Sequence, residues 1–226
     1  MFNFDKDVAK IGGWLTREEG IFLYNSAKGV PKDGKIVEIG SWKGRSTICL
    51  GNGSKDGHGA KIYAIDPHTG SSEITKKLGK VNTYNEFLIN IKRAGVEKVV
   101  VPIKEKSETA SFKIKSPVNF IFVDGAHEYS FVKQDFDLWF PKLINGGKIV
   151  FHDCWHMPGV HLFTALLLLT SNKVQKPKLL DTMTIIEKTD KNSLIDRLEN
   201  IKFVLYRALV GWVGTVKIDQ FGTVIN

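Results

Sequence analysis

Acidic and imidazole side chains stand at two places where an apolar run of the chain ends. Asp124 and His127 follow one such run, and His152 and Asp153 follow another. If the two runs are neighbouring parallel strands, their carboxyl ends meet at one edge of a sheet and bring these four side chains together. Grouped carboxylates and imidazoles can move a proton or hold a metal ion. We therefore expect a reaction centre at this edge.

The roles within this group follow from the chemistry of each side chain. His127 is the preferred general base, because an imidazole titrates near neutral pH and can take the proton of an alcohol. The structural alternative is that His127 only caps a turn after Asp124. His152 and Asp153 are the other catalytic candidates. Asp124, His152 and Asp153 also form an admissible Mg²⁺ or Mn²⁺ site, so a metal-dependent and a metal-free centre both stay open.

Two further histidines, His156 and His161, follow shortly after this group. Their spacing is not the H-E-x-x-H pattern of a zinc site, so we expect them to line a substrate loop that leads into a helix at 162–169. Aromatic residues near the expected crevice can stack on a sugar or adenine ring or pack in the core. They are Trp42, Tyr129 and Trp155.

A glycine-bearing turn follows another apolar run, in the sequence EIGSWKGRST at 38–47. Such a turn opens a helix and presents backbone N–H groups to a ligand. The spacing is not the G-x-G-x-x-G of dinucleotide binders, which disfavours nicotinamide-dependent chemistry. Glu38 lies in the apolar run itself, where a carboxylate is costly unless a partner such as a bound ammonium group pairs with it.

Asp66 closes the next apolar run, directly before Pro67. A carboxylate at the end of a neighbouring strand can accept both hydroxyls of a ribose. The alternative is a simple turn residue before proline. We favour the ribose contact because Asp66 follows the glycine turn by about one strand-helix-strand unit.

Short β-branched runs alternate with longer amphipathic ones, which predicts an α/β fold with a mostly parallel sheet. Crossover helices are expected at 84–91 and 131–140, and the glycine-rich stretch 51–60 reads as a surface turn. A C-terminal amphipathic helix carries apolar residues from Leu194 to Trp212. The predicted strands are 35–39, 61–65, 98–103, 118–123 and 148–151, followed by two closing strands at 174–180 and 183–187.

Four segments together resemble the class I S-adenosylmethionine-dependent methyltransferases. The segments are VEIGSWKGRST, AIDPH, VNFIFVDGAHEY and GGKIVFHDCW, in that family's order, and the resemblance covers 14–188. The leading GWLTREEGIFLYNSAKG is similar to the helix before the first strand in the subgroup of macrocin O-methyltransferase and the proteins labelled cephalosporin hydroxylase. Members of that subgroup methylate hydroxyls of sugars, antibiotics and other small molecules, some with a bound divalent cation.

The resemblance implies a Rossmann-like, seven-stranded, mostly parallel sheet with helices on both faces and an antiparallel last strand. It implies one domain at 1–190 with an N-terminal helical cap, followed by a helical appendage at 191–226. S-adenosylmethionine would lie with its methionine end at the glycine turn, its ribose on Asp66 and its adenine near Ser107. The expected cofactor-binding residues are Glu38, Gly40, Ser41, Gly44, Ser46, Asp66, Ser107 and Asp124.

The charge and composition of the chain limit the classes of partner and the location that we expect. The 226 residues carry a net charge of +8, which favours anionic ligands. The basic runs lack interleaved aromatic residues, so we do not expect nucleic acid as a partner. The chain has two cysteines, and we find no export signal and no apolar run of the roughly 18–20 residues that span a bilayer. We therefore expect a cytoplasmic protein.

The leading hypothesis is therefore an S-adenosylmethionine-dependent O-methyltransferase for a small molecule, such as a sugar or glycosylated metabolite. One alternative is a non-catalytic nucleotide-binding or assembly module, and a weaker one is a nicotinamide-dependent oxidoreductase. The polar face of the C-terminal helix is mixed in sign, so we expect this helix to pack on the domain or in a homodimer rather than on a membrane.

Overall fold

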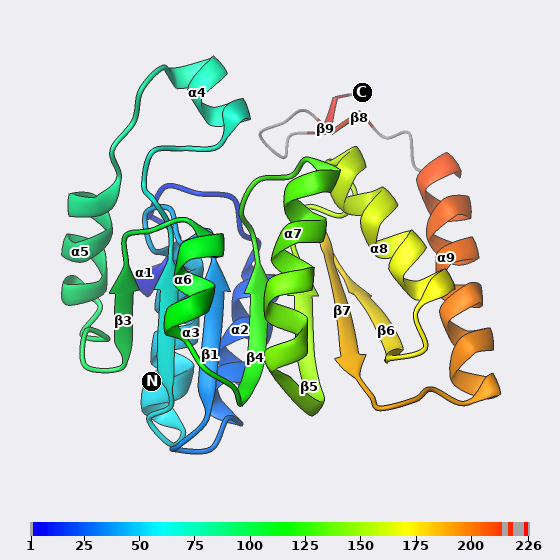
Figure 1. Cartoon of the computed structure of the whole chain (residues 1–226). Helices are drawn as coiled ribbons and strands as arrows, with labels where there is room; N and C mark the ends of the chain where they lie inside the picture. The colour runs from blue at the N-terminus through cyan, green and yellow to red at the C-terminus, as the bar shows by residue number, and fades with distance from the viewer. Residues whose placement is uncertain (1, 214–216, 219–223, 226) are drawn as a thin grey trace.

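The computed structural model describes residues 2–213, 217–218 and 224–225. A seven-stranded sheet with the order β3-β2-β1-β4-β5-β7-β6 forms its centre (Figure 1). Strands β1 to β5 are parallel to one another, and β7 is antiparallel to both of its neighbours, which confirms the predicted class of fold. The strands are β1 (Lys35–Ile39), β2 (Lys61–Ile65), β3 (Val100–Ile103), β4 (Val118–Val123), β5 (Leu143–Phe151), β6 (Val174–Leu180) and β7 (Met183–Lys188).

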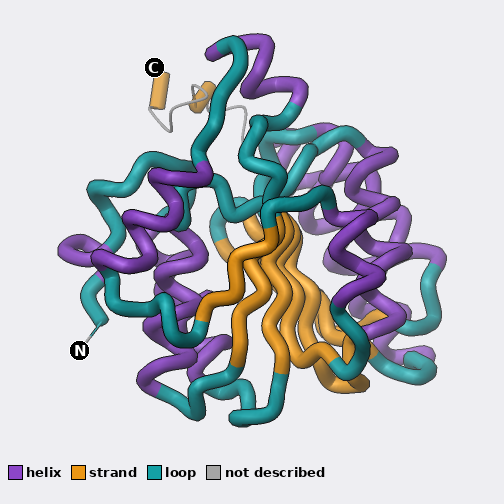
Figure 2. The backbone as a smooth tube through the Cα atoms, turned by 60° about the vertical axis from the view of Figure 1, so that its left-hand side comes forward, coloured by secondary structure: helices purple, strands orange, loops and turns teal. Residues whose placement is uncertain are grey.

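Helices cover both faces of the sheet (Figure 2). One face packs against α2, α3 and α5, and the other against α6, α7 and α8, because successive side chains of a strand point to opposite faces. A short pair of strands, β8 (Lys217–Ile218) and β9 (Val224–Ile225), lies outside the main sheet. The helices are α1 (Phe4–Asp7), α2 (Arg17–Lys28), α3 (Arg45–Asp56), α4 (Ser72–Leu78), α5 (Tyr84–Arg93), α6 (Ser107–Lys113), α7 (Tyr129–Trp139), the 3₁₀ turn η1 (Phe140–Lys142), α8 (Pro158–Thr170) and α9 (Leu194–Val213).

The ends of four parallel strands lie in register. Ile39 pairs with Ile65 on one side and with Val123 on the other, and Val123 pairs with Phe151. The hydrogen-bond ladder continues for one residue beyond the strands, since the amides of Gly40, Asp124 and His152 donate to the neighbouring strand at 2.8–3.0 Å. The residues that follow each strand therefore meet at one edge of the sheet.

The predicted surface turn at 51–60 is wrong over its first half, because α3 continues to Asp56. Glycine at 53 has a packing reason: a Cβ there would lie 2.0 Å from the carbonyl oxygen of Tyr24 in α2. The glycines of α3 allow the two helices to pack closely, which favours helix despite the poor propensity of glycine. Two strand boundaries also differ, since β3 begins at Val100 rather than at 98 and β5 begins at Leu143 rather than at 148.

The C-terminal helix is present as α9, but its apolar stripe faces outward. The side that packs on β6 and α8 includes Asn200, Phe203, Val204 and Arg207. The side chain of Trp212 and most of 214–226 lie outside the described residues. Within the described part of the chain, no helix is both long enough and apolar enough to span a membrane. The outward stripe consists of Leu194, Leu198, Ile201, Leu205 and Leu209.

Candidate active site

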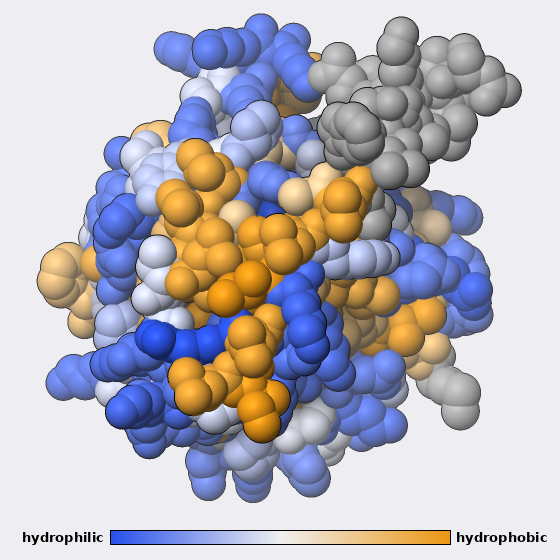
Figure 3. Space-filling model, turned by 90° about the vertical axis from the view of Figure 1, so that its right-hand side faces the viewer, coloured by the Kyte–Doolittle hydropathy of each residue, from blue (hydrophilic) through white to orange (hydrophobic). Residues whose placement is uncertain are grey.

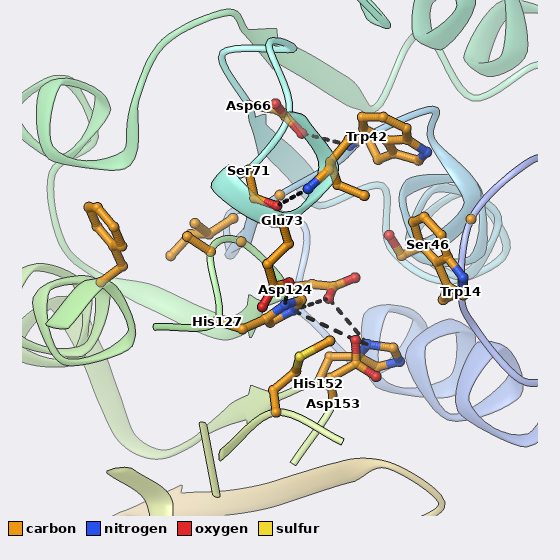
Figure 4. Close-up of a pocket in the computed structure, with 18 of the residues that line it drawn as sticks. Trp14, Trp42, Ser46, Asp66, Ser71, Glu73, Asp124, His127, His152 and Asp153 are labelled. Carbon is orange, nitrogen blue, oxygen red and sulfur yellow. Dashed lines mark hydrogen bonds and ion pairs between the residues drawn. The ribbon is translucent and has the colours of Figure 1, made fainter. Parts of the chain in front are cut away.

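A cleft of about 1940 Å³ opens at the carboxyl edge of the sheet, where the strand ends lie in register (Figure 4). Glu38 and Gly44 are the two predicted cofactor residues that do not line this cleft. The structure thus brings together most of the residues that the sequence singled out. Those that line the cleft are Gly40, Ser41, Ser46, Asp66, Ser107, Asp124, His127, His152 and Asp153.

The glycine turn follows β1 and leads into α3. Gly40 adopts φ +87°, and a Cβ there would lie 2.0 Å from the carbonyl oxygen of Asp124, so only glycine fits. Gly44 is the N-cap of α3, with φ +92° and no side-chain cap. The first turn of α3 therefore keeps backbone N–H groups that no side chain of the cap satisfies.

Two groups beside the glycine turn, Asp66 after β2 and Ser41 in the turn itself, line the cleft with unused hydrogen-bonding capacity. Asp66 accepts hydrogen bonds from the backbone amides of Trp42 at 2.7 Å and His68 at 2.6 Å. A carboxylate offers about four acceptor positions, so Asp66 can also accept from a ligand. The hydroxyl of Ser41 is buried and has no hydrogen-bond partner among the residues that the structure describes.

Glu38 lies beneath the turn rather than in the cleft. The alternation of β1 points it at α3, where Ser46 and Thr47 donate hydrogen bonds to its two carboxyl oxygens at 2.6 and 2.5 Å. Burial raises the pKa of Glu38 to about 8, although both hydroxyl donors act in the opposite direction. Glu38 therefore supports the start of α3 through these two hydrogen bonds.

Ser107 begins α6 and lies beside two residues of α7. Its hydroxyl accepts a hydrogen bond from Trp139 Nε1 at 2.8 Å. Asp135 also lines the cleft here, and burial raises its pKa to about 6 despite a hydrogen bond from Ser107. This end of the cleft offers a hydroxyl and a carboxyl group to the adenine that the sequence analysis expected at Ser107.

The four residues of the expected reaction centre converge (Figure 4). His127 Nε2 lies 3.8 Å from Asp124 Oδ1 and 3.6 Å from Asp153 Oδ2. His152 Nδ1 lies 3.2 Å from the same oxygen of Asp124 and 3.5 Å from that of Asp153. Both nitrogens are buried and make no well-aligned hydrogen bond. Two imidazole nitrogens and two carboxylates thus point at one another from β4, β5 and their following loops.

His152 is fixed from behind by Glu19 of α2. Glu19 Oε2 lies 3.1 Å from His152 Nε2, and its other oxygen accepts from the amide and hydroxyl of Thr182. Glu19 also completes the capping box of α2 with Thr16. Burial opposes the charge of Glu19, but the hydrogen bond and the charge of His152 lower its pKa below the ordinary value. A carboxylate on Nε2 orients the imidazole and directs Nδ1 at Asp124 and Asp153.

The surroundings of His127 raise the pKa of its imidazole. Burial alone would lower its pKa, but the hydrogen bond and charge of Asp124, the charge of Asp153 and a contact with Glu73 raise it to about 9. Glu73 belongs to α4 and lies 3.1 Å from His127 Nδ1. Three carboxylates surround the ring and stabilise its protonated form, so His127 as the general base stays a prediction.

Asp124, His152 and Asp153 are also a candidate metal set, since one ligand atom of each lies within 4.8 Å of the others. One imidazole and two carboxylates fit a divalent transition metal better than Mg²⁺, which prefers oxygen ligands alone. The buried Nδ1 of His152, which lacks an aligned partner, is the atom that such an ion would use.

The cleft continues past Asp153 toward α8 and α9. His156, His161 and Trp155 line this end, as expected of a substrate loop, whereas Tyr129 does not line the cleft. At the glycine turn the rings of Trp14 and Trp42 lie 6.5 Å apart between centroids, and both line the cleft.

Several residues that line the cleft were not predicted from the sequence. Glu19 carried a visible signal, because T-R-E-E at 16–19 is a capping box ahead of a helix, but nothing local links it to His152. No local signal points to Glu73, Asp135 or Arg207, which reach the cleft from α4, α7 and α9. Each stands on an amphipathic segment where a polar residue is ordinary.

Comparison with known proteins identifies the family. A family described as methyltransferase domain matches residues 37–154, slightly more than half of the chain. An uncharacterized mimivirus protein, R132 of Acanthamoeba polyphaga mimivirus, is 30% identical over 135 residues, 58% of this chain and 57% of its own length. An uncharacterized protein of Sinorhizobium fredii, y4gI, is 28% identical over 124 residues, 53% of this chain and 13% of its own length. The chain thus covers less than two thirds of either relative.

Solved structures share the fold at low sequence identity. The O-methyltransferase TomG of Streptomyces achromogenes, solved with S-adenosylmethionine, has a TM-score of 0.57 at 18% identity, covering 82% of this chain and 85% of TomG. An O-methyltransferase of Bacillus cereus, solved with S-adenosylhomocysteine, has a TM-score of 0.58 at 17% identity over 77% and 83% of the chains. The O-methyltransferase NovP has a TM-score of 0.61 at 13% identity over 76% and 80%. With this fold and the matched domain spanning β1 to the start of the loop after β5, the chain belongs to the methyltransferase-domain family.

Proposed function

We propose that the protein transfers a methyl group from S-adenosylmethionine to a hydroxyl group of a small molecule. The observation that carries this proposal is that one cleft is lined both by Asp66 with the glycine turn and by the cluster of carboxylates and imidazoles. Asp66 offers acceptors for a ribose, and the glycine turn offers Ser41 and backbone N–H groups for the charged methionine end. TomG and the Bacillus cereus enzyme, which share the fold, were solved with this cofactor or its product.

The reaction needs alignment and removal of one proton. The acceptor oxygen attacks the methyl carbon, the bond from that carbon to the sulfonium sulfur breaks, and the products are a methyl ether and S-adenosylhomocysteine. The hydroxyl proton passes to the cluster of Asp124, His127 and Asp153, where His127 Nε2 lies within 4 Å of a carboxylate oxygen of each aspartate. No covalent intermediate with the protein is required. His152 positions Asp124 and Asp153 by its contacts with both.

A divalent cation fits the same cluster. Asp124, His152 and Asp153 would hold it, with Glu19 orienting the imidazole of His152. Bound there, the ion would act as a Lewis acid that favours loss of the acceptor proton. The mixed nitrogen and oxygen donor set supports Mn²⁺ over Mg²⁺.

Titration with Mn²⁺, followed by electron paramagnetic resonance, tests the cation site. We expect saturable Mn²⁺ binding by the wild-type protein and a loss of affinity of at least about tenfold in His152→Gln. His156→Gln is the matched control, since His156 lines the cleft outside the cluster. A His152→Gln protein that binds Mn²⁺ as well as the wild type would remove the cation from the proposal.

A sugar or another compact polar molecule is the acceptor class that the cleft suits. The reaction cluster lies inside a cleft rather than on an open face, and Trp14 and Trp42 provide aromatic surface at its rim.

The two cysteines, Cys49 and Cys154, are buried and unpaired, which supports a reducing, cytoplasmic location.

We also propose a homodimer through α8 and α9. Ten large apolar side chains on these helices are at least 40% exposed, and orange side chains gather on this face of the molecule (Figure 3). Half-exposed side chains of this size hold roughly 300–600 Å² of apolar surface in total, about the apolar share of a standard interface of roughly 800 Å² per partner. The residues are Leu162, Leu166, Leu169, Leu194, Ile195, Leu198, Ile201, Leu205, Tyr206 and Leu209.

Isothermal titration with S-adenosylmethionine and S-adenosylhomocysteine tests the proposed function. We expect wild-type binding to weaken by about 10–100-fold in Asp66→Ala, because two hydrogen bonds to a charged acceptor are lost. Asp56→Ala is the control, since Asp56 ends α3 away from the cleft. If the folded wild type binds neither compound, the methyltransferase proposal fails. Binding without turnover on any hydroxylated acceptor would favour the non-catalytic module.

A further inference from the structure

Arg207 of α9 is a buried cation at the end of the cleft next to α8, whereas the expected cofactor residues, Asp66 and the glycine turn, follow β2 and β1. Its side chain is 2% exposed, and it is the one lysine or arginine among the described residues that is fully buried. It also lines the same cleft as Asp66 and Asp153. The described part of the chain provides it with no carboxylate partner.

The hydrogen bonds of Arg207 in the described residues all go to neutral oxygen atoms, and its guanidinium also lies over the ring of Phe203, 5.8 Å from the centroid. Nη1 donates to the hydroxyls of Thr164 in α8 at 2.9 Å and Thr184 in β7 at 3.0 Å, and Nη2 donates to the carbonyl of His161 at 3.1 Å. A guanidinium has five N–H groups, so the Nε–H and one N–H of Nη2 have no partner in the described residues. Those two donors are enough to bind one oxyanion.

A purely structural role does not account for the positive charge. A neutral side chain could bridge two hydroxyls and a carbonyl, whereas a buried charge without a counter-charge carries a large desolvation cost. The field of this charge is felt nearby: burial and then the charge of Arg207 lower the pKa of His161. The local charge is therefore not compensated by the protein itself.

Two hydrogen bonds connect Arg207, through His161, to the loop that carries Asp153. His161, whose carbonyl it binds, places its own Nδ1 3.1 Å from the carbonyl oxygen of Cys154, the residue after Asp153. One cleft includes both Arg207 and the glycine turn with Asp66, which follow β1 and β2. The acceptor of the methyl group must lie between them.

We propose that Arg207 binds an anionic group of the methyl acceptor, so that the acceptor is a hydroxylated molecule that carries a carboxylate or a phosphoryl or sulfuryl group. This inference rests on the proposed function, because it names the substrate class of the same cleft. The net charge of +8 is consistent with an anionic substrate. Arg207 thus sets acceptor specificity and takes no part in the transfer itself.

The test uses the full-length protein saturated with S-adenosylhomocysteine and labelled with ¹⁵N, so that the Nε–H signals of its arginines are resolved. Arg207→Lys identifies the Arg207 signal by its disappearance. Sulfate and acetate are then added separately at constant ionic strength, sulfate as the probe for phosphoryl or sulfuryl groups and acetate for carboxylates. The signal of Arg197 serves as the internal reference, because Arg197 is exposed on the same helix and does not line the cleft.

We expect at least one anion to shift the Arg207 signal saturably while the Arg197 signal stays in place. The same titration of Arg207→Gln, followed through the backbone amide of Thr184, should show at least tenfold weaker binding. A wild-type protein that binds S-adenosylhomocysteine but shows no saturable shift with either anion overturns the anion site and leaves the proposed function intact. Failure to bind S-adenosylhomocysteine overturns the proposed function instead. The wild-type titration decides the question even if Arg207→Gln does not fold.

Discussion

Glu38 carries a buried carboxyl group whose ionisation the fold opposes. The pKa of Glu38 is raised to about 8 in the folded protein from an ordinary value of 4.5. Between these two values the unfolded chain has lost the proton that the folded protein keeps, so this group lowers the free energy of unfolding as pH rises from about 4.5 to about 8. The hydroxyls of Ser46 and Thr47 can serve either the charged or the neutral form, since a hydroxyl both donates and accepts.

Glu38→Gln should remove this pH dependence, because an amide mimics the neutral carboxyl group. We expect the variant and the wild type to have similar free energies of unfolding near pH 5. By pH 8 the variant should be more stable by an amount on the order of a few kcal/mol. Urea unfolding at pH 5, 6.5 and 8 measures both. Two curves that stay parallel across this range would show that Glu38 is already ionised in the folded protein.

His127 is the imidazole that faces both the cleft and the two carboxylates of the cluster. We expect His127→Ala to lower turnover by about 100-fold or more, the usual contribution of a positioned proton-transfer group. Affinity for S-adenosylhomocysteine should change by less than about twofold, because the ion-pair and hydrogen-bond partners of the His127 ring among the described residues are Glu73, Asp124 and Asp153, not Asp66 or the glycine turn. His58→Ala, an exposed histidine after α3, is the control for both measurements. Full activity of His127→Ala would exclude His127 from the mechanism.

Among the secondary-structure elements, the close packing of α3 against α2 positions the glycine turn, which directly precedes α3. The site at the start of α3 depends on this contact, because α3 carries Ser46 and Thr47 against Glu38. A Cβ at Gly53 would meet the Tyr24 carbonyl oxygen at 2.0 Å, and backbone cannot give way as a side chain can. The packing of two helices therefore restricts a residue that lies far from the cleft.

Gly53→Ala should destabilise the protein by about 2–3 kcal/mol, even though alanine is the better helix former. Gly29→Ala is the matched control, since Gly29 adopts right-handed helical angles at the end of α2 and its nearest contact to a Cβ would be 3.8 Å. We expect that substitution to change stability by less than about 0.5 kcal/mol. Equal thermal unfolding midpoints for both variants would contradict the account of the α2 and α3 contact.

For the whole molecule, the outward apolar faces of α8 and α9 predict self-association. Leu198 is 57% exposed near the middle of the stripe. We expect light scattering coupled to size exclusion to give twice 25.3 kDa for the wild type and 25.3 kDa for Leu198→Glu, since a buried charge would disrupt the interface. Ile89→Glu changes an apolar position on α5 that is 49% exposed, and it should leave the dimer intact. A monomeric wild type would rule out the dimer, and flotation with liposomes would then favour a membrane surface.

The sequence alone determined the elements and the edge at which the site forms. Short β-branched, largely apolar runs and the turn signals around them set β1, β2 and β4 to the residue, because both are local properties of the sequence. Since parallel strands expose their carboxyl ends together, the positions of Asp66, Asp124, His127 and Asp153 after β2, β4 and β5 predicted one cleft.

Only the tertiary structure decided which groups surround each of these residues. His152 meets Glu19, 133 positions earlier in the chain, and three carboxylates raise the pKa of His127. The helix at the C-terminus brings Arg207 to the cleft and turns its leucines outward, opposite to what its amphipathic pattern suggests. Burial and charge depend on neighbours within a few ångströms that the sequence separates widely, so no local pattern encodes them.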